Sequence, residues 1–257
     1  MRFDRMRPDQ LHEAVARGLP FVLPIGVMEY HGRHLPAGVD LIVVTEMLDR
    51  LGDEIVVLPP FAYGAASHAV AGPEDGGTLH VDAAAILPFA EALFASLLRG
   101  GYRNIHGIVH HQTENFVQGM PTDLVFRLAA RNAIFRHLEA TRGPGWWGAG
   151  EMADYYRQHA AGTDPFAWIQ VHPLFPEGAD FPFDHAGEGE TALMLALAPE
   201  TVDPDRANGD GHWYTDTAPR ARADRGAEGV AIALTHLRRV LGLEAGPDDT
   251  AGTERTR

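Results

Sequence analysis

Short apolar runs alternate with helical patterns along most of this chain. Three runs have the length and apolar character of strands and cover residues 21–27, 54–60 and 104–111. Helical patterns cover residues 8–18, 39–52, 83–101, 123–143, 185–200 and 226–242. Strands separated by helices predict an α/β fold with a mostly parallel sheet. In such sheets ligands bind beyond the carboxyl ends of the strands.

Prolines and loops modify this pattern. Pro24 in the first run indicates a position near a sheet edge or a strand end, because proline cannot donate to a strand ladder. Pro88 is expected to break the helical pattern at 83–101 or to begin it. The segment 144–183 is irregular, and 61–82 is a long loop of the kind that is usually functional.

The length of 257 residues is near the upper end for a single hydrophobic core. We expect one domain over residues 1–245 and a disordered tail over 246–257. No apolar run approaches the ~18 residues that span a bilayer. The N-terminal residues have no apolar segment of the secretory type behind their charges. We therefore expect a cytoplasmic protein without a membrane partner.

Charge and composition exclude several classes of function. With 21 basic and 35 acidic residues the net charge is −14, which repels a phosphate backbone and argues against nucleic-acid binding. The absence of cysteine excludes disulfides and thiolate-bound zinc. Every basic residue is arginine, so lysine Schiff bases and P-loop lysines are excluded. The first strand is followed by PIGVMEYHG, which lacks the glycine fingerprint of a dinucleotide site.

The loop after the first strand gathers side chains that can bind metals. Glu29, His31, His34 and Asp40 lie within twelve residues between two apolar segments. Glu29 and His31 are two residues apart, so in extended backbone they face the same side. Taken singly, Asp40 could be a helix cap and His34 a surface residue. Together, the carboxylates and the imidazole of His31 indicate a site for Zn²⁺ or Mn²⁺, in which an aspartate can bridge two ions.

Two motifs give this chain a family resemblance. GVMEYHGRHLPAGVD resembles the creatininase signature G-S-x-E-Q-H-G-P-H-L-P-x-x-x-D, with Tyr30 and Arg33 as departures at positions that are not ligands. HAGEGETALMLALAPETV resembles a second motif of that family, and GGTLHVD a third. The resemblance covers residues from about 8 to 203. It implies a three-layer α/β/α fold, two zinc or manganese ions, a homohexamer, and hydrolysis of amide-type bonds in small cyclic substrates.

The resemblance also implies the metal ligands. Glu29, Asp40 and a histidine near position 111 would hold one ion, while His31, a bridging Asp40 and a second carboxylate would hold the other. The segment VHHQTENFVQG has one residue too many between the expected histidine and Glu114. Either His111 is the ligand, with a one-residue bulge, or His110 is; we favour His111, since neighbours in a strand face opposite sides. Glu114 is the candidate second carboxylate, and Glu190 replaces it if Glu114 points away.

Three residues are candidates for proton transfer to the leaving group. His185 matches a family histidine beside the substrate, and Glu114 and Glu190 are the other candidates. The alternative for Glu188 and Glu190 is that they only complement a helix dipole. By a loose alignment His68 is a pocket candidate.

Substrate identity is the least determined property. Trp146, Trp147 and Trp168 fall where creatininase has its lid, and could form an aromatic wall for a flat ring, or core or oligomer contacts instead. Phe181 stands where creatininase has tryptophan, which weakens the case for creatinine itself. We therefore expect a dinuclear hydrolase that opens or cleaves a small cyclic substrate at an amide-type C–N bond. The alternatives are C–C ring opening of a cyclic ketone, such as an oxidised inositol, and an inactive metal-binding protein.

Overall fold

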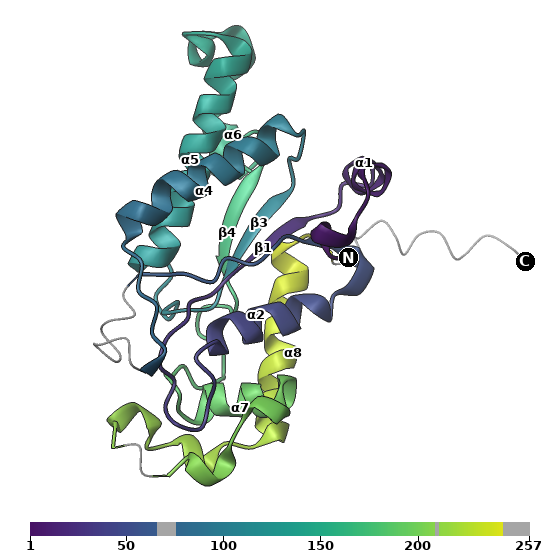
Figure 1. Ribbon diagram of the computed structural model, residues 1–257. Coiled ribbons are helices and arrows are strands. Elements are labelled where there is room, and N and C mark those ends of the chain that lie inside the picture. The colour runs from purple at the N-terminus through teal and green to yellow at the C-terminus, as the bar shows by residue number, and fades with distance from the viewer. Residues whose placement is uncertain (66–75, 209–210, 244–257) are drawn as a thin grey trace, which may run out of the picture.

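The computed structural model describes residues 1–65, 76–208 and 211–243. His68 and the expected tail at 246–257 lie outside these ranges. The sheet has four parallel strands in the order β2-β1-β3-β4 (Figure 1). The strands are β1 (Phe21–Ile25), β2 (Val56–Val57), β3 (Ile105–Val109) and β4 (Ile169–Pro173). The predicted parallel α/β sheet is confirmed.

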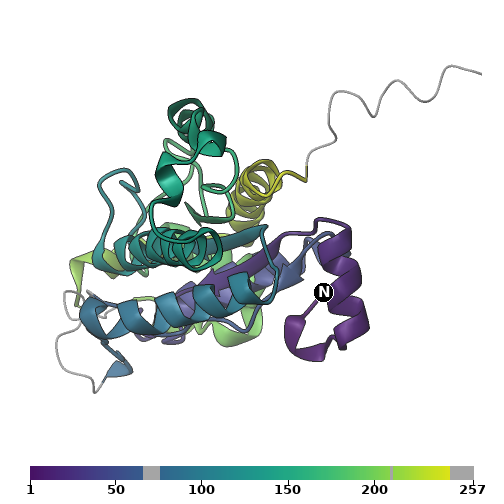
Figure 2. The same ribbon diagram turned by 90° about the horizontal axis from the view of Figure 1, so that it is seen from above.

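Helices cover both faces of this sheet (Figures 1 and 2). One face packs against α2 (Val39–Asp49), α7 (Glu188–Leu197) and α8 (Ala223–Val240). The other packs against α4 (Ala83–Arg99) and α5 (Pro121–Arg142). The side chains of β1 alternate accordingly: Val22 enters the first core, and Phe21, Leu23 and Ile25 enter the second. The result is the expected three-layer α/β/α arrangement.

Two further α-helices occur among the described residues. They are α1 (Pro8–Ala16), whose Ala14 is buried in the second core, and α6 (Tyr155–Ala160). Short 3-10 helices occur at Phe3–Arg5, Gly52–Glu54, Trp146–Gly148, Gly150–Met152, Pro199–Thr201, Pro204–Arg206, Trp213–Thr215 and Ala218–Arg220. No helix within the described ranges is both long enough and apolar enough to cross a membrane.

One of the two proline predictions needs correction. Pro24 is the fourth of the five residues of β1, near the end of an inner strand, which is one of the two positions expected for it. Its carbonyl accepts from the N–H of Phe61, so its own nitrogen faces the side where Pro59 and Pro60 interrupt the ladder, and no donor is missed there. Pro88 neither begins nor breaks α4, because the helix continues through it. The carbonyl of Ala84, which loses its partner, belongs to an exposed residue and can bind water.

Strand β4 lies inside the segment that the sequence indicates to be irregular. It pairs with β3 from Ile105 opposite Ile169 to Val109 opposite Pro173. Only Ile169 of its five residues is fully buried, and Gln170 and His172 interrupt its apolar pattern. The strand is therefore stabilised by pairing along β3, a long-range contact that leaves little local signal.

Candidate metal centre

The metal-capable side chains meet where β1 and β3 end. Strand β1 has β2 on one side and β3 on the other, so the chain changes direction across the sheet at this point, which is where open α/β sheets bind ligands. Gly26 follows β1 and touches the start of α2: a Cβ there would lie 2.6 Å from the Leu41 nitrogen. This close approach brings Asp40, near the start of α2, next to the loop that carries Glu29 and His31.

The first cluster contains Glu29, Asp40 and His111, all buried. His111 Nδ1 lies 3.1 Å from Asp40 Oδ2 and 3.2 Å from Glu29 Oε1. The second cluster contains His31, Asp40 and Glu190, again all buried. His31 Nε2 lies 3.6 Å from Asp40 Oδ1 and 3.4 Å from Glu190 Oε2. Each cluster thus combines two carboxylates and one imidazole, and Asp40 directs a different oxygen to each.

Backbone carbonyls orient both imidazoles. His31 Nδ1 donates to the carbonyl of Glu29 at 2.9 Å, and His111 Nε2 donates to the carbonyl of Ala65 at 3.2 Å. In the neutral rings the lone pairs of His31 Nε2 and His111 Nδ1 then point at the carboxylates. Histidines that bind metals are held in this way, with the second nitrogen donating to a carbonyl or carboxylate.

The electrostatics of the two clusters favour a bound cation. Burial alone would lower the pKa of His31, but Glu190 and Asp40 raise it to about 9. Burial would raise the pKa of Asp40, yet His111 and His31 hold it well below its ordinary value. Burial raises the pKa of Glu190 to about 8. Glu29 Oε2 and His31 Nε2 have no hydrogen-bond partner despite being buried. Oxygen and imidazole donors of this kind fit Zn²⁺ or Mn²⁺.

The start of α7 holds Glu190 in place. Asp184 accepts backbone N–H bonds from Gly189 at 2.7 Å and from Glu190 at 3.1 Å. Glu190 Oε2 in turn accepts from the N–H of Ala186 at 2.7 Å, and Ala186 has the unusual φ of 53°. A non-glycine residue in this region is strained, and such strain is common at functional sites. The motif HAGEGE therefore acts as a tight turn that directs a carboxylate into the cavity.

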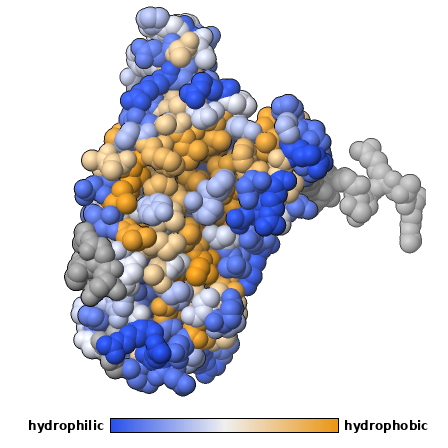
Figure 3. All heavy atoms as spheres, viewed as in Figure 1, coloured by the Kyte–Doolittle hydropathy of each residue, from blue (hydrophilic) through white to orange (hydrophobic). Residues whose placement is uncertain are grey.

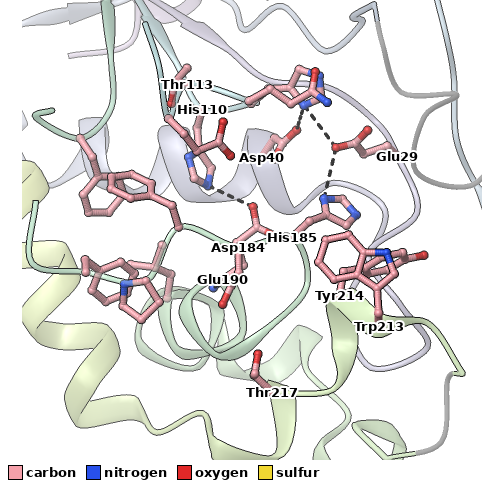
Figure 4. A pocket seen from close by; sticks show the side chains of 18 residues that line it. Glu29, Asp40, His110, Thr113, Asp184, His185, Glu190, Trp213, Tyr214 and Thr217 are labelled. Carbon is pink, nitrogen blue, oxygen red and sulfur yellow. Dashed lines mark hydrogen bonds and ion pairs between the residues drawn. The ribbon is translucent and has the colours of Figure 1, made fainter. Parts of the chain in front are cut away.

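His185 lies between the two clusters and the cavity (Figure 4). Its Nε2 donates to the carbonyl of Tyr30 at 2.7 Å, and its Nδ1 lies 3.6 Å from Glu29 Oε1. The His185 ring centroid is 4.2 Å from that of His31. Burial, reinforced by His31, lowers the pKa of His185 to about 4.

The structure brings together most of the residues named from the sequence. His110 and His111 both line the cavity, because β3 ends at Val109 and the alternation of a strand no longer applies to them. His110 Nε2 lies 3.7 Å from Glu190 Oε1. Glu114 also lines the cavity, but it is exposed. It belongs neither to the two clusters nor to the third candidate group among the described residues, which contains Glu29, His31 and His185.

Two further expectations concern His34 and the tryptophans. His34 is buried and its Nε2 hydrogen-bonds with Thr191 Oγ1 at 2.9 Å, which ties the metal-binding loop to α7. Trp146 and Trp168 pack against the core between the sheet, α4 and α5, and none of the three tryptophans named from the sequence lines the cavity. Trp213 and Tyr214 line it instead (Figure 4). The signal for them was the aromatic pair in GHWYT, which lies outside every predicted element.

A protein-family comparison decides the relationship of this chain to known proteins. The model of the creatininase family, described as creatinine amidohydrolase, matches residues 4–235. The chain belongs to the creatininase family. The motifs at Glu29–Asp40 and His185–Val202 both fall inside the matched region.

The chain is similar to two curated proteins. The chain is 29% identical over 194 residues to a creatinine amidohydrolase of Pseudomonas putida, a match that covers 72% of this chain and 66% of the relative. It is 25% identical over 237 residues to a 3-dehydro-scyllo-inosose hydrolase of Thermotoga maritima, covering 91% of this chain and 66% of the relative. The chain thus matches just under two thirds of the length of each curated relative.

Solved creatininase structures share the fold. A creatinine amidohydrolase (creatininase) crystal structure superposes with a TM-score of 0.66 at 21% identity, covering 96% of this chain and 98% of the other. Two further creatininase structures, one described as Zn-Zn type and one as Mn, each superpose with a TM-score of 0.63 at 20% identity, covering 93% of this chain and 97% of the other.

Proposed function

We propose that this creatininase-family chain is a dinuclear metal hydrolase that opens or cleaves small cyclic amides. The observation that carries the proposal is the pair of buried carboxylate–imidazole clusters that share Asp40. A catalytically inactive scaffold would gain nothing from burying these groups against one another, since burying charges without a compensating cation is costly. The Zn-Zn and Mn forms of related creatininases support the choice of metals.

The metal ligands would be assigned to the two ions as follows. Glu29, Asp40 and His111 would hold one ion, and His31, Asp40 and Glu190 the other. Bound divalent ions would activate a water molecule and polarise the substrate carbonyl. Our proposal assigns the second carboxylate ligand to Glu190 and not to Glu114, because Glu190 is buried beside His31 and Glu114 is exposed at the cavity wall.

His185 would carry the proton that the leaving nitrogen needs. Its Nε2 is engaged with the carbonyl of Tyr30, which leaves Nδ1 on the side of Glu29 and the cavity. A group held at this place can accept a proton at Nδ1 and pass it to a departing atom. Asp184 and the turn before α7 keep the neighbouring Glu190 oriented during this transfer.

A second candidate function is the hydrolytic opening of a cyclic ketone at a C–C bond. The match to an inosose hydrolase over 91% of this chain favours it. The same activated water would attack the ketone, and the proton held by His185 would go to the departing carbon. The two functions differ in their products: cleavage of a C–N bond releases an amine together with a carboxylate, while C–C cleavage yields a carboxylate alone.

The test begins with metal content per chain, measured by elemental analysis on the wild type and on His31→Ala. We expect close to two zinc or manganese ions in the wild type and fewer in the variant; His12→Ala, at an exposed histidine of α1, is the matched control. The loaded protein is then screened on cyclic amides and keto-inositols for new amine and carboxylate groups. A metal-free wild type after supplementation would contradict the proposal.

We further propose that the chain self-associates through the outer face of α4. Apart from Glu91, this helix carries no charge before its last residue, Arg99. Phe89 is 55% exposed on it, and apolar side chains gather over this helix in Figure 3. Helices that are apolar on all sides are usually buried. Sedimentation of wild type and Phe89→Glu would test this, and a monomeric wild type would refute it. The hexameric stoichiometry, the cytoplasmic location and the absence of nucleic-acid binding stay predictions.

A further inference from the structure

Aromatic side chains line the cavity beside the metal clusters. The cavity has a volume of about 430 Å³ and is lined by residues of both clusters and by Leu193 of α7 (Figure 4). Its aromatic lining consists of Phe175, Phe181, Phe183, Trp213 and Tyr214. A volume of this size is ample for a small ring.

Trp213 belongs to this aromatic lining without being packed into the core. It is 84% exposed, more than any other large apolar side chain among the described residues. Its ring makes an edge contact with the ring of Tyr214, with the centroids 5.8 Å apart and an interplanar angle of 82°. Tyr214 stacks on His212 at 5.0 Å and meets the ring of His185 edge-on at 5.2 Å. A chain of ring contacts thus connects the exposed indole to the residue that faces the reaction centre.

Apart from its histidines, the ionisable acidic and basic side chains that line the cavity among the described residues are carboxylates. Five carboxylates line it, namely Glu29, Asp40, Glu114, Asp184 and Glu190. No arginine is present among the described lining residues, and the chain has no lysine. Two divalent ions would offset four of these five charges, and they would lie at the end that binds the reacting carbonyl. A carboxylate at the other end of a substrate would therefore lie near other carboxylates and meet neither arginine nor lysine, and like charges repel.

From these contacts we propose that Trp213 is the substrate-stacking residue of this site, and that the cavity selects flat rings that are uncharged or cationic and rejects rings that carry a carboxylate. This inference rests on the proposed hydrolase function for the orientation of the ring. The carbonyl side of the ring faces the two clusters, and the ring face lies on the indole. Stacking on an aromatic plane favours flat rings of any polarity. The absence of arginine among the described lining residues disfavours rings that carry a carboxylate.

The first arm of the test uses tryptophan variants of the metal-loaded protein. Trp213→Ala should weaken ring binding, measured by calorimetry, about tenfold while leaving metal content unchanged, because only the stacking contact is lost. Trp213→Phe should recover most of that loss. Trp147→Ala is the matched control, since Trp147 is 49% exposed but lies outside the cavity. Equal affinity in the wild type and in Trp213→Ala would overturn the stacking role.

The second arm uses pairs of flat rings that differ by one substituent carrying a carboxylate. Uracil and hydantoin are the uncharged rings; orotate and hydantoin-5-acetate are their charged partners. We expect each uncharged ring to bind at least tenfold more tightly than its partner. Equal or tighter binding of the charged rings, or no binding of any of the four at millimolar concentration, would overturn the selection. Binding needs no turnover, so a protein that binds rings through Trp213 but hydrolyses none refutes the proposed function alone.

Discussion

Replacing Asp40 by asparagine tests the shared position of this side chain most directly. The substitution keeps the shape of the residue and removes one negative charge. Asp40 Oδ2 lies 3.1 Å from His111 Nδ1, and Asp40 Oδ1 lies 3.6 Å from His31 Nε2. Both clusters therefore lose the same charge at once. We expect Asp40→Asn to bind neither ion tightly and to be inactive.

The size of the loss follows from the charges. Two unit charges about 4 Å apart interact by about 4 kcal/mol at an effective dielectric constant near 20. That energy is roughly a thousandfold in an equilibrium constant, and a doubly charged ion would feel more. The fold should survive, because His111 still has Glu29 at 3.2 Å and His31 still has Glu190 at 3.4 Å. The loss of unfolding free energy should thus stay below the about 3–5 kcal/mol of a fully broken buried pair.

The assay measures ions per chain after dialysis, with circular dichroism and urea unfolding on the same samples. Asp123→Asn is the matched control. Asp123 is also a buried carboxylate in the first turn of a helix, where it accepts from the N–H of Met120 at 2.6 Å and pairs with Arg127. This control should lose about 1 kcal/mol of unfolding free energy and keep both ions. An Asp40→Asn protein that retains two ions with unchanged affinity would refute the shared role.

Three further predictions follow from the same contacts. Glu190→Gln should lose one ion and at least ~100-fold in kcat, whereas Glu114→Gln should change kcat less than about tenfold; the reverse order would assign the ligand to Glu114. Asp184→Ala should lower the unfolding free energy by about 1–2 kcal/mol and weaken metal binding about tenfold, as measured by chelator competition; unchanged metal affinity would contradict its positioning role. Burial lowers the pKa of His106 to about 3 and of His172 to about 4, from 6.5. Between pH 6.5 and 4 the unfolded chain therefore binds more protons than the folded chain. The free energy of unfolding should decrease as the pH is lowered, by up to about 1.4 kcal/mol per pH unit for each histidine. Urea unfolding of His172→Gln should show a shallower decrease, and a slope equal to that of the wild type would refute this.

The sequence was sufficient for the features that are local in the chain. Strand β1 and helix α2 enclose a single segment in which Glu29, His31 and Asp40 are close in sequence and in space. Their convergence needs only the period of a strand, a short loop and the start of a helix. Most of the parallel sheet was predictable as well, since the runs that form β1, β2 and β3 are short and largely apolar.

Features that depend on distant contacts were not predictable in this way. The choice between Glu114 and Glu190 depends on how the turn before α7 approaches the end of β3, and the two segments are far apart in the chain. Trp213 reaches the cavity from a short 3-10 helix without hydrophobic periodicity. Strand β4 is visible only once β3 is available as its partner. In each case the contact that decides the structure joins two distant segments, and the sequence of neither segment indicates that they meet.

The sharing of Asp40 has a consequence for how the loaded protein would fill. One carboxylate that serves two ions makes their occupancies thermodynamically linked, so each ion changes the affinity for the other by the same factor. A first ion would order the carboxylate, neutralise part of its charge and repel a second ion. A second ion would therefore bind at an ordered but less negative site. A metal titration should show two unequal steps in place of two independent, identical ones, and a partly loaded population would contain mostly one-ion molecules.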